Sequence, residues 1–185
     1  KFIFYSRIHK KKGLLIILDY LISLNQNIYL DIYGFIEDEI YWHKCLEKLK
    51  YLKNVRYMGP LNNGDISELK NKYSFFLFPT LNENYGHVIV EMLSIGLIPV
   101  VSKGTNPFDE LLNSEINLNF NLYSFDDFKL QIEKIIDFNE SKIFTLKKRV
   151  KQLFNKLVED QSYIINEYII FINNLSKWVK LIQNY

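Results

Sequence analysis

Two glutamates eight positions apart, Glu83 and Glu91, flank a segment whose glycine, Gly86, marks the start of a predicted helix. The free N–H groups and positive dipole of a helix start bind phosphate, and a glycine lets the phosphate approach without interference from Cβ. Glu91 would lie roughly 9 Å further along the helix, where a carboxylate can accept hydrogen bonds from ribose hydroxyls. From spacing alone, the commoner alternative is a solvated loop carboxylate at Glu83 and a surface charge at Glu91.

A second charged loop, residues 6–13, follows the apolar, aromatic residues 2–5 and ends at Gly13. Its Arg7 can bind two phosphate oxygens at once, and Lys12 can act as a flexible point charge. Together they would offset the negative charge of a diphosphate. The alternative is a solvated basic loop, which is the usual fate of a run of lysines.

The elements that must position these residues alternate between strands and helices. The sequence predicts strands at 2–5, 28–33, 54–58, 74–78, 98–102 and 117–120, and helices at 14–24, 39–52, 66–73, 85–95 and 107–113. Such alternation predicts an α/β fold with a Rossmann-like, doubly wound parallel sheet, in which ligands bind at the carboxyl edge of the strands. Both charged loops follow predicted strands and are therefore expected at that edge. Residues 124–185 are predicted to be helical.

Five segments occur in the order found in GT-B glycosyltransferases. They are the loop Arg7 to Gly13, the strand end Asp31-Ile32-Tyr33-Gly34, the segment Asn54 to Gly59, the step Pro79-Thr80 and the segment Glu83 to Glu91. The chain resembles the family-4 retaining enzymes (glycosyl transferases group 1), whose nucleotide-sugar domain carries a Glu-x7-Glu motif. Residues 31–42 and 83–87 resemble in particular bacterial transferases that build surface polysaccharides such as capsule and O-antigen.

The resemblance implies a diphosphate site. Arg7 and Lys12 match the basic pair that holds the donor diphosphate in this family. The backbone amides that would assist them belong to Gly86, His87 and Val88. The side chain of His87 could donate to a phosphate or to the sugar, or it could serve a merely structural purpose at the helix start.

The resemblance also implies roles for the two glutamates. Glu83 matches the first glutamate of the motif, at the donor hexose and the reacting centre, and Glu91 matches the second, on the ribose. The sugar would be transferred with retention of configuration by a front-face route. The basic pair Arg7 and Lys12 would stabilise the departing diphosphate. No covalent protein nucleophile and no cofactor are implied. The sequence has no Asp-x-Asp element suited to a metal ion, so none is expected.

Two segments depart from the family pattern. Two residues, rather than one, separate Gly96 from Pro99, and the segment 102–108 differs from the Ser-Asp-x-Thr-Pro-Trp pattern of the polysaccharide subgroup. Because this second segment should face the donor, the identity of the donor stays open. UDP-hexoses and GDP-hexoses both fit, and the sequence specifies neither the acceptor nor the oligomeric state.

The chain length suits one domain, whereas a GT-B enzyme needs two domains of roughly this size. We expect residues 1–160 to form the donor-binding domain, and the absent amino-terminal domain to hold the acceptor. Residues 161–185 are expected to form a C-terminal helix with an apolar stripe. The stripe could pack on the absent domain or on its own domain, and Lys177 and Lys180 make contact with a membrane surface a third alternative.

With 48% hydrophobic residues, the chain has ample material for a globular core. Its net charge of +2 argues against a strong polyanion-binding surface, so no nucleic-acid partner is expected. No apolar run approaches the ~20 residues of a membrane span. Cys45, the only cysteine, cannot form an internal disulfide, which fits a reducing cytoplasm. We expect a cytoplasmic protein, with peripheral association at the inner face of the plasma membrane as an option.

The expected function is therefore the donor-binding domain of a retaining hexosyltransferase that acts on a glycan or lipid-linked saccharide acceptor in surface-polysaccharide synthesis. Two alternative functions would use the same nucleotide-sugar binding site. A GT-B epimerase would act on its bound sugar nucleotide without an acceptor. A noncatalytic module would bind the nucleotide sugar and transfer nothing. We expect the isolated chain to bind a donor but to transfer little.

Overall fold

The computed structural model describes residues 1–24, 26–61 and 66–159 of the chain. At its centre lies a five-stranded, all-parallel sheet with the order β3-β2-β1-β4-β5. The strands are β1 (Phe2–Tyr5), β2 (Leu30–Tyr33), β3 (Val55–Gly59), β4 (Phe75–Phe78) and β5 (Ile98–Val101). The predicted α/β, Rossmann-like, doubly wound sheet is thus confirmed.

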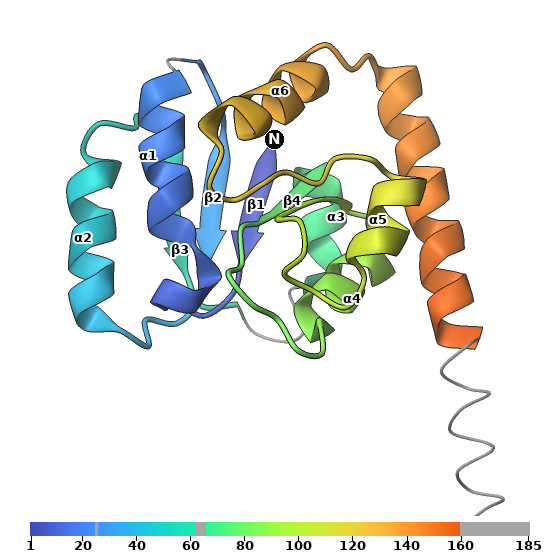
Figure 1. Ribbon diagram of the computed structural model, residues 1–185, viewed down its shortest axis with the longest axis horizontal. Coiled ribbons are helices and arrows are strands. Elements are labelled where there is room, and N and C mark those ends of the chain that lie inside the picture. The colour runs from blue at the N-terminus through green and yellow to red at the C-terminus, as the bar shows by residue number, and fades with distance from the viewer. Residues whose placement is uncertain (25, 62–65, 160–185) are drawn as a thin grey trace, which may run out of the picture. The chain divides into compact units, whose positions relative to one another are not determined.

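Helices cover both faces of this sheet. They are the 3-10 turns η1 (Lys10–Lys12) and η2 (Ile66–Glu68) and the helices α1 (Leu14–Leu24), α2 (Glu39–Leu49), α3 (Leu69–Lys72), α4 (His87–Ser94), α5 (Asp109–Glu115) and α6 (Phe125–Ile136). Figure 1 shows α1 and α2 together on one side of the sheet and α3 and α4 on the other. This follows from the strand order, because right-handed crossovers that run outward from β1 in opposite directions place their helices on opposite faces.

The strands are buried as strands of a covered parallel sheet should be. Every residue of β2, β4 and β5 is buried, and the four residues of β4 are Phe-Phe-Leu-Phe. The edge strand β3 instead alternates, with Val55 buried and Arg56 and Met58 exposed. The continuous apolar runs in the sequence therefore mark the interior strands, since helices cover both of their faces.

Some predicted boundaries are wrong. The predicted strand 117–120 is reduced to a single bridge between Ser102 and Phe120, because Asn117 has a left-handed backbone and the Asn119 amide donates to Asp109. The predicted helix 66–73 consists of η2 and the single turn α3, since Tyr73 already has an extended backbone that leads into β4. The predicted helix 85–95 is shorter, because the left-handed Gly86 caps α4.

Residues 140–159 are also helical. The chain divides into two compact units, residues 1–151 and a second unit that begins at residue 152. The predicted C-terminal helix 161–185 lies outside the described residues, and the predicted division at residue 160 stays a prediction. Within the part of the chain that is described, no helix is both long enough and apolar enough to cross a membrane.

Candidate functional site

The two charged loops meet where the winding of the sheet changes direction. The loop after β1 leads to α1 and the loop after β4 leads to α4, and these two strands are neighbours with helices on opposite faces. At such a switch point the loops diverge and leave a crevice at the carboxyl edge of the sheet. The structure has a cavity of about 280 Å³ there. Its described lining consists of Tyr5, Ser6, Arg7, Lys12, Gly34, Phe35, Pro60, Leu61, Glu83, His87 and Val88.

Backbone hydrogen bonds fix the loop after β1 against the loop after β2. The N–H of Ile8 donates to the carbonyl of Phe35, and the carbonyl of Ile8 accepts from Glu37 and Asp38. The loop then closes in η1 and turns at Gly13, which has a φ of +68°. A Cβ at Gly13 would lie 1.9 Å from the carbonyl oxygen of Pro79, so only glycine permits this close approach to the loop after β4.

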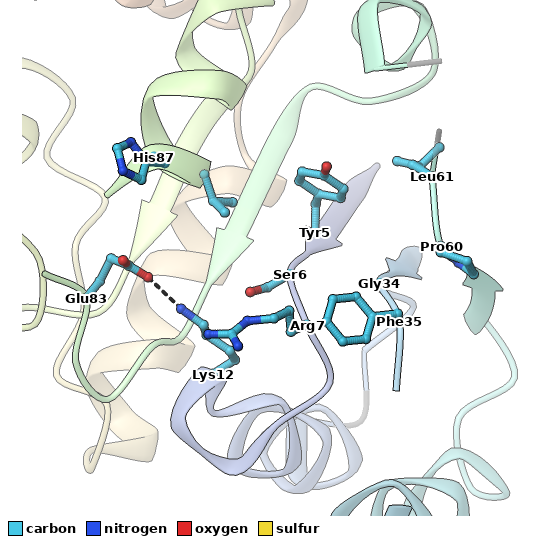
Figure 2. Close-up of a pocket in the computed structure, with 11 residues that line it drawn as sticks. Tyr5, Ser6, Arg7, Lys12, Gly34, Phe35, Pro60, Leu61, Glu83 and His87 are labelled. Atoms are coloured by element: carbon cyan, nitrogen blue, oxygen red, sulfur yellow. Dashed lines mark hydrogen bonds and ion pairs between the residues drawn. The ribbon is translucent and has the colours of Figure 1, made fainter. Parts of the chain in front are cut away.

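Lys12 and Glu83 meet across the cavity. Lys12 Nζ lies 2.5 Å from Glu83 Oε2, and the two side chains are 10% and 16% exposed (Figure 2). Burial by itself raises the pKa of a carboxyl group, but Lys12 and the amides of Gly86 and Tyr85 hold the pKa of Glu83 below its ordinary value. The structure therefore contains a charged, largely desolvated pair, in which each member could exchange its partner for a group on a ligand.

Arg7 also has a carboxylate partner, which the sequence did not indicate. Arg7 Nη1 donates to Glu37 Oε1 at 2.7 Å in an exposed ion pair. Glu37, Asp38 and Glu39 form an acidic run at the start of α2, where negative charge suits the helix dipole. Asp38 is indeed the N-cap of α2, and its side chain accepts from Tyr41 N–H, whereas Glu37 instead faces Arg7. Because the pair is exposed, the guanidinium keeps donors that can reach a phosphate.

The start of α4 contributes to the cavity through His87 and Val88. Gly86, the residue before them, is buried and left-handed, and a Cβ there would lie 2.6 Å from the ring of Phe108. The Gly86 N–H donates to Glu83 Oε1 at 3.4 Å, and Gly86 is not among the described residues of the lining. Gly86 therefore positions the helix start rather than facing the cavity. His87 is exposed, and its ring stacks on that of Tyr85.

Glu91 is not among the described residues that line the cavity. It is partly buried on α4, and this burial raises its pKa. Burial also raises the pKa of Tyr5, with a smaller contribution from the charge of Glu91. Since Tyr5 lines the cavity, the charge of Glu91 acts on a group of the lining. The structure thus brings Arg7, Lys12 and Glu83 together with the start of α4, and Glu91 is not among the described residues of the cavity.

The other half of the cavity is apolar and was missed by the sequence analysis. Figure 2 shows Phe35, Pro60 and Leu61 on the side opposite Glu83 and His87, with Arg7 and Lys12 between them. The order of strands and loops could have predicted this apolar side, because Phe35 follows β2 and Pro60 follows β3 at the same carboxyl edge. The cavity can therefore accommodate an elongated ligand with an apolar end and an anionic middle. Among the described residues, no three His, Cys, Asp or Glu side chains lie close enough together to hold a metal ion.

Comparisons with known proteins agree with this architecture. The family model of glycosyl transferases group 1 matches residues 1–156. No curated protein matches the sequence. Sucrose-phosphate synthase from Thermosynechococcus elongatus is 13% identical, with a TM-score of 0.74 over 91% of this chain and 45% of that protein. A trehalose-6-phosphate protein from E. coli, bound with UDP-2-fluoro glucose, is 12% identical, with a TM-score of 0.72 over 90% of this chain and 43% of that protein.

A third structure matches this chain over most of the length of both chains. The C-terminal domain of a glycosyl transferase group 1 family protein from Francisella tularensis is 12% identical, with a TM-score of 0.68 over 84% of each chain. At these identities the structures show the fold alone, which is that of a GT-B glycosyltransferase domain. The chain spans less than half the length of the first two proteins. The family match covers most of the chain and all of the described cavity lining. The chain belongs to the glycosyl transferases group 1 family.

Proposed function

We propose that this chain is the donor-binding domain of a retaining, family-4 hexosyltransferase whose donor is a nucleoside-diphosphate sugar. The observation that carries the proposal is the cavity itself. Two cations, Arg7 and Lys12, lie between an apolar wall and the carboxylate of Glu83 at the carboxyl edge of a doubly wound sheet. A nucleoside-diphosphate sugar has the same sequence of parts, because its diphosphate lies between a base and a hexose.

This match gives the donor a direction. The diphosphate binds Arg7 and Lys12, and the N–H groups at the start of α4 bind the same oxygens. The base and ribose extend toward Phe35 and Leu61, and the hexose extends toward Glu83. Glu91, whose charge acts on Tyr5 of the lining, is the proposed partner of the ribose. When the diphosphate takes over Lys12, the carboxylate of Glu83 becomes free to accept hydrogen bonds from hexose hydroxyls.

The chemistry proposed for this site is front-face transfer. The bond between the anomeric carbon and the donor phosphate breaks, the acceptor hydroxyl attacks from the same side, and its proton passes to the departing diphosphate. Arg7 and Lys12 stabilise the charge that develops on the diphosphate in the transition state. Glu83 holds the hexose through its hydroxyls and orients the anomeric carbon.

The acceptor site belongs to the rest of such an enzyme. We propose that a second domain binds a glycan or a lipid-linked saccharide, and that the enzyme acts in surface-polysaccharide synthesis in the cytoplasm, at the inner face of the plasma membrane. The UDP sugar bound to the E. coli relative supports a nucleotide-sugar donor. The isolated chain is expected to bind donors and to transfer little.

Calorimetric titration with UDP, GDP and ADP, and then with UDP-glucose and GDP-mannose, tests this proposal. We expect one nucleotide to bind selectively, and Lys12→Ala and Arg7→Ala each to weaken its binding about 10- to 100-fold, since hydrogen bonds to charged groups are lost. Lys10→Ala is the matched control, because Lys10 belongs to the same turn but is exposed and absent from the lining. Equal affinities in folded Lys12→Ala and Lys10→Ala variants would contradict the proposal.

A further inference from the structure

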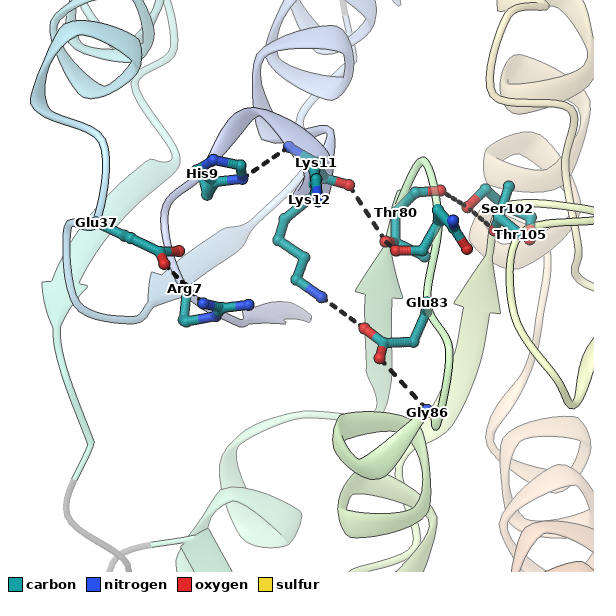
Figure 3. A network of polar contacts seen from close by, with 11 residues as sticks. Arg7, His9, Lys11, Lys12, Glu37, Thr80, Glu83, Gly86, Ser102 and Thr105 are labelled. Carbon is teal, nitrogen blue, oxygen red and sulfur yellow. Dashed lines mark hydrogen bonds and ion pairs between the residues drawn. The ribbon is translucent and has the colours of Figure 1, made fainter.

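Beside the Lys12–Glu83 pair, three hydroxyl groups connect three different loops (Figure 3). Ser102 follows β5, and its Oγ lies 2.6 Å from the carbonyl oxygen of Thr80 and 2.8 Å from Thr105 Oγ1. Thr80 follows β4, and its own hydroxyl lies 3.2 Å from the carbonyl oxygen of Lys11, in the loop after β1. The side chains of Ser102 and Thr80 are completely buried. None of these three residues is among the described residues that line the cavity.

The direction of these hydrogen bonds follows from proton counting. A carbonyl oxygen only accepts, so the single proton of Ser102 is donated to Thr80 O. The Thr105 hydroxyl lies 2.8 Å from Ser102 Oγ and 3.0 Å from the carbonyl oxygen of Ser102, so its single proton is shared between these two acceptors. The single proton of the Thr80 hydroxyl is shared between two carbonyl oxygens, Lys11 O at 3.2 Å and Asn82 O at 3.1 Å. The hydroxyls of Thr105 and Ser102, the peptide carbonyl of Thr80 and the hydroxyl of Thr80 thus form one series of polar groups from the loop after β5 to the loop after β1.

Both ends of this series reach the peptide groups beside the charged pair. At one end, Lys11 O, directly before Lys12, also accepts from Leu81 N–H at 2.8 Å. At the other end, Thr105 O accepts from the N–H of Glu83 at 2.7 Å. The backbone of Lys12 and the backbone of Glu83 are therefore tied to the same series of hydroxyls, with Ser102 in the middle.

We propose that Ser102 is a positioning residue of the donor site, and that its hydroxyl sets the separation between Lys12 and Glu83. The inference rests on the proposed function, because the pair is taken to divide the donor into diphosphate and hexose. Loss of the hydroxyl leaves Thr80 O without its buried donor, and it leaves the Thr105 hydroxyl with the carbonyl oxygen of Ser102 as its remaining acceptor. The loops after β4 and β5 then relax independently, and Glu83 moves away from Lys12.

The test compares variants that differ in one hydroxyl. Ser102→Ala removes the central group, and Thr105→Val removes its donor while keeping the shape of the side chain. Thr105→Ser keeps the donor and serves as the rescue, and Ser23→Ala is a matched control, since Ser23 bonds only within α1. NMR titration of the Glu83 carboxyl group gives the readout, because contact with Lys12 lowers the pKa of this residue.

We expect Ser102→Ala and Thr105→Val to raise the pKa of Glu83 toward its ordinary value, and Thr105→Ser and Ser23→Ala to leave it unchanged. Binding of UDP-glucose or GDP-mannose, whichever the unaltered chain binds, should weaken about tenfold in the first two variants. Urea unfolding shows that each variant is folded. An unchanged Glu83 titration in both folded variants would overturn the positioning role, whether or not a nucleotide binds. Failure of the unaltered chain to bind any nucleotide would count against the proposed function alone.

Discussion

Glu91 is a residue at which the proposed function and the stability of the fold oppose each other. Its side chain is partly buried, and burial raises the pKa of its carboxyl group. The folded chain therefore binds this proton more tightly than the unfolded chain does. Above the ordinary carboxyl pKa of about 4.3, stability from this group falls as the pH rises through the raised native value. The ionised form of this carboxylate therefore costs stability, as is common at functional sites.

We predict that Glu91→Gln raises the urea midpoint of unfolding at pH 7 and weakens nucleotide binding about tenfold, since the amide is a poorer acceptor for ribose hydroxyls. The gain in stability should disappear below about pH 4, where the carboxyl group is protonated in both states. Glu110→Gln is the control, because Glu110 is an exposed acid on α5. A lower midpoint for Glu91→Gln at pH 7 would show that the carboxylate has a stabilising partner.

The charged part of the candidate site could be predicted from the sequence, and its pairing could not. Arg7, Lys12 and Glu83 follow strands, and the edge rule places all three at the same side of the sheet. Their neighbours depend on strand order, which brings the loop after β4 beside the loop after β1. The ion pair between Lys12 and Glu83 joins residues 71 positions apart, and no local pattern encodes such a contact.

At the scale of the elements, Asp31 joins two strands, β2 and β3, to the residues that lead into β1 and β4. It lies on β2 and is 1% exposed. Its carboxylate accepts from Lys1 Nζ at 2.5 Å, from Arg56 Nη2 at 3.1 Å and from the hydroxyl of Tyr73 at 2.7 Å. Burial by itself would raise the pKa of Asp31, but these partners hold it below its ordinary value. The stabilisation is therefore complete above the ordinary pKa and is lost as the pH falls through the native one.

We predict that Asp31→Asn lowers the free energy of unfolding by about 2–4 kcal/mol at pH 7, because a buried acceptor of several charged hydrogen bonds is lost. The estimate is below the upper range for buried pairs, since Lys1 and Arg56 remain partly solvated. Asp19→Asn should cost less than about 1 kcal/mol, because its pair with Lys48 is exposed. Urea unfolding of both variants measures the difference. Equal losses would show that the Asp31 cluster contributes no more than a surface pair.

The same comparison explains which elements the sequence could predict. The strands and α1 were predicted closely, because their buried runs and helical spacing are local signals. The segment 117–120 has the composition of a strand, but it makes only one bridge to Ser102. The stretch 66–73 contains apolar residues at helical spacing, yet Tyr73 is drawn into an extended backbone by its bonds to Asp31 and Tyr33. Tertiary contacts decide these cases.

At the scale of the whole molecule, Cys45 reports on how the unit formed by residues 1–151 opens. Its thiol is on α2, is fully buried and contacts Tyr41, whose hydroxyl accepts from Leu15 N–H in α1. Burial raises the pKa of Cys45 to about 12, with smaller contributions from Asp19 and Asp38. Only an exposed thiolate reacts with a disulfide reagent. The thiol is therefore expected to react through opened forms of the unit, and it is the only one in the chain.

We predict that labelling of Cys45 at pH 8 is at least about a thousandfold slower in buffer than in denaturing urea, in line with the stability of an ordinary domain. If α1 and α2 open only with the sheet, the free energy of opening measured by labelling should equal the free energy of unfolding measured in urea. Both should then fall with urea concentration at the same slope. A nucleotide that occupies the cavity at 100 times its Kd should slow labelling about a hundredfold, because it binds only the closed form. A labelling rate that changes with neither urea nor nucleotide would mean that α2 opens alone. The loops carrying Arg7 and Glu37 would then not be held by the unit as a whole.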